Sequence, residues 1–112
     1  MGSIAGNVPT VKKAIYAVSK AAVHEYTKCL AALVRPHNIY VNCVAPGLIM
    51  TERYKKAMKI VPDEKTIKMS SLERHGMSVE VARVVEFLVS EGVSYMTGQI
   101  INIDGGRGSP GY

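Results

Sequence analysis

The sequence lacks any apolar run long enough to cross a membrane. Its longest run, Cys29 to Val34, is far short of the roughly twenty apolar residues that a spanning helix requires. The residues that follow Met1 form neither the basic segment nor the apolar segment of a secretory signal. We therefore expect a soluble chain, located in the cytoplasm and without a membrane partner.

The sequence also has little that could bind a metal ion. Its two cysteines, Cys29 and Cys43, have no metal-ligand spacing, and we interpret both as small buried residues. His24, His37 and His75 are scattered along the chain, and we interpret them as surface histidines. No metal site is predicted.

Positive charge is in moderate excess, with a formal net charge of +5. Five lysines gather in one stretch: Lys55, Lys56, Lys59, Lys65 and Lys68. Stacking aromatic residues are not interleaved with them, and no nucleic-acid recognition motif is present. We interpret this stretch as a solvated face, or as a rim for an anionic cofactor or substrate, and expect no nucleic-acid partner.

A glycine-rich turn between a first strand and a first helix is absent as well. Enzymes that bind dinucleotides use such a turn to bring backbone amides at a helix N-terminus to the pyrophosphate. The glycines here cluster at 2–6, 47, 76, 92–98 and 105–111, and none forms Gly-x-x-x-Gly-x-Gly or Gly-x-Gly-x-x-Gly opening a helix. The sequence therefore has no recognisable pyrophosphate site.

The apolar pattern that is present predicts one α/β unit. Residues 11–35 have helical periodicity, and residues 39–44 form a β-branched run typical of a buried strand. Charged residues interrupted by Pro-Asp predict two short helices over 51–71. A helix is expected over 78–92, with its first residue as N-cap, and a last strand over 99–103. Helix, strand, short helices, helix and strand form the second half of a parallel α/β sheet.

The helix expected over 11–35 is apolar over most of its circumference. One stripe contains Val18, Ala22, Cys29, Leu30 and Leu33, and neighbouring alanines widen it. Such a helix must be covered on two sides, by its own sheet and by a partner. We therefore expect this helix to form a contact between copies of the chain in a homo-oligomer.

Tyr16 and Lys20 lie one helical turn apart, and Ser3 precedes Tyr16 by thirteen residues. A phenol has an unperturbed pKa of about 10, so its use as a proton donor or acceptor requires a nearby cation that favours the phenolate. Residues four apart on a helix are close enough for such a charge to contribute about 3 kcal/mol at an effective dielectric of about 20. The bare Tyr-x-x-x-Lys spacing also occurs by chance on surface helices.

Four ordered segments give the pair its context. They are Gly-Ser-Ile-Ala-Gly at 2–6, Tyr-Ala-Val-Ser-Lys-Ala-Ala-Val at 16–23, Val-Asn-Cys-Val-Ala-Pro-Gly-Leu-Ile-Met-Thr at 41–51 and Met-Thr-Gly-Gln-Ile-Ile-Asn-Ile-Asp-Gly-Gly at 96–106. With these segments the chain resembles the short-chain dehydrogenase/reductase family, and most of all its 3-oxoacyl-carrier-protein reductases. The resemblance runs from Ser3 to about Gly106.

This resemblance implies the C-terminal half of a Rossmann-like, doubly wound parallel sheet. The family's N-terminal half, with its adenosine pocket and a catalytic helix asparagine, has no counterpart here. We therefore expect residues 1–112 to be a single partial domain, the catalytic half presented as a separate chain. Residues 52–75 would be a substrate lid and 107–112 a tail.

The resemblance also implies roles for individual residues in an NAD(P)-dependent oxidoreductase that interconverts a carbonyl and a secondary alcohol. Tyr16 would be the general acid or base, Lys20 would tune it and bind the nicotinamide ribose, and Ser3 would polarise the substrate oxygen. The cofactor-binding positions would be Tyr16, Lys20, Pro46, Gly47, Ile49 and Thr51.

Two questions stay open from the sequence. It does not identify the substrate, and it does not distinguish NAD from NADP, because the deciding residue follows a second strand that is absent here. The alternative reading is a non-catalytic truncated fragment, an oligomerisation or interaction polypeptide that acts through the helix at 11–35.

Overall fold

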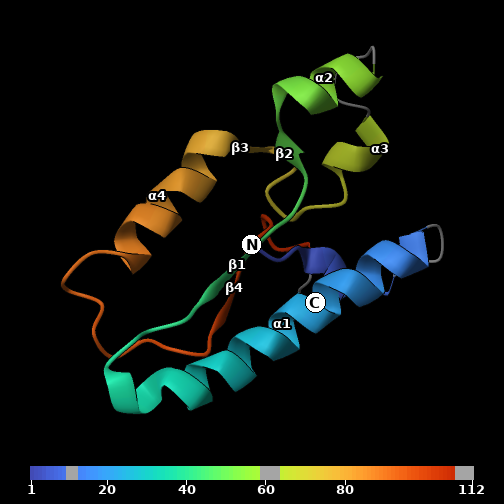
Figure 1. Ribbon diagram of the computed structural model, residues 1–112. Coiled ribbons are helices and arrows are strands. Elements are labelled where there is room, and N and C mark those ends of the chain that lie inside the picture. The colour runs from blue at the N-terminus through green and yellow to red at the C-terminus, as the bar shows by residue number, and fades with distance from the viewer. Residues whose placement is uncertain (10–12, 59–63, 108–112) are drawn as a thin grey trace.

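The computed structural model describes residues 1–9, 13–58 and 64–107 (Figure 1). Two 3₁₀ turns, Ile4–Gly6 and Arg35–His37, accompany the regular elements. The helices and strands in chain order are α1 (Ala14–Val34), β1 (Cys43–Pro46), β2 (Ile49–Met50), α2 (Glu52–Met58), α3 (Glu64–Ile67), β3 (Gly76–Met77), α4 (Ser78–Leu88) and β4 (Ile100–Ile103).

The strands form two parallel pairs, which confirms the α/β class. β1 pairs with β4, Cys43 opposite Ile100, and β2 pairs with β3, Ile49 opposite Gly76. Parallel neighbours need a crossover between them. The long segment that contains α4 connects β1 to β4, and the segment that contains α2 and α3 connects β2 to β3. In Figure 1, α1 and α4 flank the β1–β4 pair on opposite sides. The β2–β3 pair was not predicted, because two-residue strands carry no periodicity.

The strand predicted over 39–44 is displaced, since β1 begins at Cys43 and continues to Pro46. Side-chain hydrogen bonds and one backbone bond, from Gly98 N to Val41 O at 2.7 Å, hold the residues before it. Val41 N donates to Thr97 Oγ1 at 3.0 Å, and Asn42 Nδ2 donates to Met96 O at 2.8 Å. The regular ladder between β1 and β4 therefore begins after these contacts, at Cys43 and Ile100. The last strand predicted, 99–103, corresponds to β4, which begins one residue later at Ile100.

Helix α1 confirms the long helix, and its end at Val34 agrees with the predicted stop. The predicted positions 11 and 12 lie outside the described residues. A 3₁₀ turn containing Pro36 follows, and Asn38 closes it with a left-handed φ of 57°. The Pro-His-Asn sequence therefore ends the helix as expected.

The face of α1 that the chain's own core buries is not the apolar stripe. His24, Thr27 and Ala31 are buried, whereas Val18 and Leu33 are exposed. Cys29 is exposed too, so its predicted burial is wrong, while Cys43 is buried as expected. The inward face tolerates polar side chains because local hydrogen bonds satisfy them; the Thr27 hydroxyl, for example, donates to Val23 O at 2.8 Å.

Helix α4 starts at Ser78 with Met77 as N-cap, so the predicted capping role of Ser78 is wrong. The Glu80 carboxylate instead accepts the Met77 N–H at 2.7 Å. The helix ends at Leu88, before the predicted stop at Gly92. Between β2 and β3 lie the two short helices expected over 51–71, although the Pro62-Asp63 break between them lies outside the described residues.

The core of the described residues is small. Its buried apolar members are Ile4, Ala31, Cys43, Val44, Ala45, Val81 and Val93. Large apolar side chains on α1 and α4 remain exposed, among them Ile15, Leu33, Val79 and Phe87. No helix in the described ranges is long and apolar enough to cross a membrane. With so little apolar area buried, we expect marginal stability for the chain by itself.

Candidate functional site

Tyr16 and Lys20 lie in the first two turns of α1, as the sequence predicted. The Lys20 Nζ lies 5.6 Å from the centroid of the Tyr16 ring, within reach of a cation–π contact. The same ammonium donates to the Met1 carbonyl oxygen at 3.3 Å. Tyr16 is 45% exposed.

Ser3 stands in the segment that packs beside this part of α1. It is the N-cap of the first 3₁₀ turn, where its hydroxyl oxygen accepts the Ala5 N–H at 3.2 Å. Its own N–H donates to His24 Nε2 at 3.4 Å. Together with the bond from Lys20 to Met1, this contact joins the N-terminal segment to α1 at two points. The three predicted catalytic residues therefore belong to one corner of the fold.

Pro46 and Gly47 lie at the carboxyl end of β1, as expected for a ligand-binding turn. Gly47 N donates to Ile103 O at 2.9 Å, and a Cβ on Gly47 would lie 2.8 Å from Asp104 Cα. The close approach of two strand ends is therefore enough to require glycine here. Ile49 opens β2, and Thr51 Oγ1 accepts the Tyr54 N–H at 3.1 Å at the start of α2.

We predict that Gly47→Ala lowers stability by about 1–3 kcal/mol, because the added methyl group would meet backbone atoms that cannot yield. Gly92→Ala is the matched control, since a Cβ there meets nothing within 4 Å. Thermal unfolding of both variants checks this. A Gly47→Ala midpoint equal to that of the control would contradict the packing argument.

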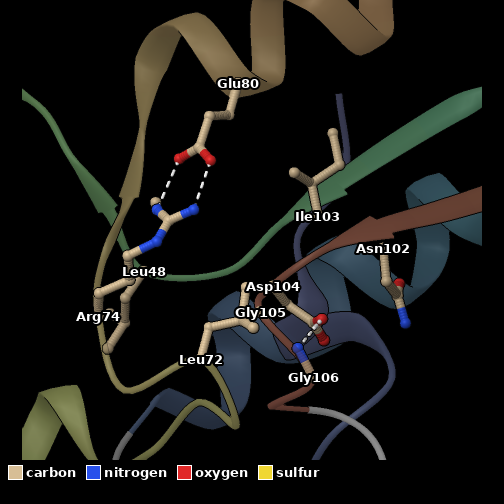
Figure 2. Close-up of a pocket in the computed structure, with 10 residues that line it drawn as sticks. Leu48, Leu72, Arg74, Glu80, Asn102, Ile103, Asp104, Gly105 and Gly106 are labelled. Carbon is tan, nitrogen blue, oxygen red and sulfur yellow. Dashed lines mark hydrogen bonds and ion pairs between the residues drawn. The ribbon is translucent and has the colours of Figure 1, made fainter.

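A pocket of about 280 Å³ opens beside this turn (Figure 2). Leu48, Leu72, Arg74, Gly76, Glu80, Asn102, Ile103, Asp104, Gly105 and Gly106 line it. Gly105 and Gly106 have φ values of 62° and 84°, which favour glycine. Ser3, Tyr16 and Lys20 are not among the lining residues, so the structure does not bring the predicted catalytic corner into this pocket.

An ion pair that the sequence analysis missed crosses the pocket wall. In Figure 2 the Arg74 guanidinium faces the Glu80 carboxylate, with N–O distances of 2.9 and 2.6 Å. The hydrogen bond from Arg74, and then the one from Met77 N–H, lower the pKa of Glu80 to about 2. A spacing of six residues across a turn has no helical signature, so no pattern in the sequence predicts this pair.

Acid should weaken this contact. The ordinary carboxyl pKa is 4.5 and that of Glu80 is about 2, so its contribution is present above about pH 4.5 and is lost as the pH falls through about 2. We expect the unfolding midpoint of Glu80→Gln to vary less with pH over this interval than that of the unaltered chain. Parallel pH dependences for the two proteins would show that the pair does not contribute.

Two histidines predicted to lie on the surface are buried instead. His24 packs under the N-terminal segment, with Nδ1 3.0 Å from Asn7 Oδ1. Burial first, and then the charges of Lys28 and Lys20, lower the pKa of His24 from 6.5. His75 lies edge-on to the ring of Tyr54, at 5.6 Å between centroids. Only His37 is exposed as expected.

The chain is similar to known proteins over most of its length. A family model described as enoyl-(acyl carrier protein) reductase matches residues 1–107. The 3-oxoacyl-(acyl-carrier-protein) reductase FabG of Chlamydia trachomatis is 42% identical over 91 residues, which are 81% of this chain and 36% of that protein.

Solved structures extend the likeness to the fold. A short-chain dehydrogenase family protein from Francisella tularensis is 30% identical with a TM-score of 0.86, covering 97% of this chain and 49% of that one. A 4-hydroxyisoleucine dehydrogenase complexed with NADH is 29% identical with a TM-score of 0.90, covering 98% and 46%. This chain thus spans less than half the length of each relative. It has the Rossmann-like α/β fold of those proteins, and it belongs to the short-chain dehydrogenase/reductase family.

Proposed function

We propose that this chain is the catalytic, C-terminal part of an NAD(P)-dependent oxidoreductase that interconverts a carbonyl and a secondary alcohol. The observation that carries the proposal is the Tyr16–Lys20 pair, which lies in the first two turns of α1 beside the segment that contains Ser3. Membership of the family supports it, as does the NADH complex of a structural neighbour.

Each of the three residues has a task in this proposal. In reduction, the Tyr16 hydroxyl gives its proton to the substrate carbonyl oxygen, and in oxidation it takes the proton back. The Lys20 ammonium lies beside the ring, where it can donate to the cofactor and place a positive charge next to the reacting hydroxyl. The Ser3 oxygen accepts the Ala5 N–H, so its own proton remains available to the substrate oxygen, where charge develops.

The residues present fit one end of the cofactor. Tyr16 and Lys20 offer a hydroxyl and an ammonium suited to a ribose, and Thr51 offers a hydroxyl in the segment after the Pro46-Gly47 turn. Ile49 follows that turn and would contribute through its backbone. When bound, the nicotinamide supplies or accepts the hydride. Because the chain has no glycine-rich turn that opens a helix, we assign it the nicotinamide end only, with NAD and NADP both open.

Residues 52–75 are proposed as a substrate lid. They leave the sheet after β2 and return at β3, so they form an excursion next to the pocket, and α2 and α3 stand apart from the β1–β4 pair in Figure 1. The substrate is proposed as a small carbonyl compound. Of the proposed tail, 107–112, only residue 107 lies within the described part of the chain.

The exposed apolar face of α1 supports a homo-oligomer. Ile15, Val18, Tyr26 and Leu33 are all more than half exposed, on the face turned away from β1. Apolar patches of this kind on a helix are typical of interfaces between subunits. The same face is the observation that favours the second candidate function, a non-catalytic interaction polypeptide.

We predict that replacing Val18 by Glu reduces self-association, because it places a charge within this apolar face. Light scattering at micromolar concentration should show oligomers for the unaltered chain and smaller species for Val18→Glu. Glu25, exposed on the same helix, supplies the control Glu25→Gln, which should not change the size. A monodisperse monomer for the unaltered chain would refute the oligomer.

A further inference from the structure

His24 occupies a slot that two glycines leave open. The side chain is 4% exposed and lies one turn after Lys20, on the inward face of α1. A Cβ on Gly2 would lie 2.4 Å from His24 Nε2, and a Cβ on Gly6 would lie 2.6 Å from Cε1. Neither position could hold a larger residue without moving the ring, so the loop that carries Ser3 is shaped around this imidazole.

The hydrogen bonds of the His24 ring determine which ring nitrogen carries the proton. A backbone N–H can only donate, so the 3.4 Å contact from Ser3 N requires a lone pair on His24 Nε2. The proton of the neutral ring is then on Nδ1, which donates to Asn7 Oδ1 at 3.0 Å. Asn7 Nδ2 in turn donates to Asn102 Oδ1 at 3.0 Å. A continuous chain thus joins the Ser3 backbone to β4 and to the pocket wall.

We propose that His24, as the neutral Nδ1–H tautomer, is a positioning residue that holds Ser3 in register with Tyr16 and Lys20. The proposal rests on the function proposed above, because that function assigns Ser3 its contact with the substrate oxygen. The ring itself has no access to substrate, being covered by the N-terminal segment and β1. Its contribution passes through the Ser3 backbone.

The surroundings of the ring favour its neutral form. Burial first, and then the charges of Lys28 and Lys20 on the same helix, lower the pKa of His24. From the N-terminal segment the uncharged Ser3 and Asn7 face it, and from β1 the Cys43 thiol lies nearby. A second proton, on Nε2, would face the Ser3 N–H, and the hydrogen bond would be lost because both groups would be donors. The hold on Ser3 is therefore present above the ordinary pKa of 6.5 and is lost as the pH falls through the lowered value.

Nitrogen NMR of the unaltered chain, labelled at histidine, tests the tautomer without any substitution. We expect His24 to show a protonated Nδ1 and an unprotonated Nε2, with a titration midpoint below the ordinary histidine pKa of 6.5. The Ser3 amide resonance should move with the same midpoint as His24. An Nε2–H tautomer, or a His24 midpoint at or above 6.5, would overturn the proposal.

A pair of variants tests whether the acceptor itself is needed. Gln can accept from Ser3 N and donate to Asn7, whereas Leu can do neither. Amide hydrogen exchange at Ser3 should be about tenfold faster in His24→Leu and close to the unaltered rate in His24→Gln, since one net hydrogen bond is worth about that factor. The surface variant His37→Gln serves as the control. Equal exchange in the Leu and Gln variants would contradict positioning, and if His24→Leu does not fold, the tautomer measurement decides.

These readouts do not depend on turnover. If Tyr16→Phe kept full activity, the oxidoreductase proposal would fail while the His24 tautomer and the Ser3 exchange rates stayed as expected. If the tautomer were wrong while Tyr16→Phe abolished activity, only the positioning role would fail. The two failures are therefore distinguishable.

Discussion

The isolated chain of 112 residues should have no measurable dehydrogenase activity and should bind NAD(P) weakly at best. In dinucleotide-binding sheets a glycine-rich turn at a helix N-terminus holds the pyrophosphate, and this sequence has no such turn. The residues proposed here for the cofactor would contact only its nicotinamide end. Fluorescence titration with NADH and NADPH, together with turnover of a 3-oxoacyl thioester, checks this expectation.

The sheet gives a second reason for this expectation. β1 has β4 on one side, whereas on the other the described residues supply only the bond from Gly2 N to Val44 O, at 2.8 Å. An apolar strand with an open edge tends to aggregate or to pair with another chain. We expect the chain to become active when a polypeptide carrying the N-terminal half of a relative is added.

One result of this complementation experiment would contradict the expectation. Purified chain that is monomeric, unfolds cooperatively and turns over a carbonyl substrate by itself would overturn the assignment as a partial domain. As a control, the N-terminal polypeptide alone should show no turnover. Neither result depends on which nicotinamide cofactor is used, provided that both are tried.

Tyr16→Phe, made in the complemented protein, should lower turnover by at least about a hundredfold. The substitution removes the hydroxyl that exchanges a proton with the substrate oxygen and keeps the ring. Because the side chain is 45% exposed and its ring contacts Lys20 at 5.6 Å, the loss of one oxygen should leave the fold unchanged. Steady-state kinetics and the thermal unfolding midpoint together separate these effects.

Tyr40→Phe is a matched control for that variant. Tyr40 is also 45% exposed, and its hydroxyl donates to Asn38 Oδ1 at 2.9 Å, away from the proposed site. We expect Tyr40→Phe to turn over at a rate close to that of the unaltered protein. Retention of activity to within a few-fold in Tyr16→Phe would remove the catalytic assignment.

The elements with strong periodic patterns could be predicted from the sequence. The helix that became α1 and the strand that became β4 extend over several residues of consistent pattern, and turn residues mark their ends. The β2–β3 pair could not be predicted, since it consists of two residues on each side and depends on the return of a distant segment. The same is true of the Arg74–Glu80 ion pair.

The site was predicted in part, for a related reason. Tyr16 and Lys20 are close because helix geometry alone sets a four-residue spacing. The burial of His24 depends on tertiary structure, namely the two glycines that face it and an acceptor–donor chain through Asn7. A polar residue on an apolar helix suggests a surface position until those partners are known. The exposed stripe on α1 was recognised as apolar, but the pattern did not reveal which side faced the chain's own sheet.

The central claim, hydride transfer with Tyr16 as proton donor, can be tested most directly by isotope transfer. The complemented protein is incubated with a 3-oxoacyl thioester and with NADH or NADPH that carries deuterium at both C4 positions of the nicotinamide. The account predicts an alcohol product with deuterium on the former carbonyl carbon, and little product from Tyr16→Phe over the same time. An alcohol without deuterium, or labelled product formed equally well by Tyr16→Phe, would contradict it.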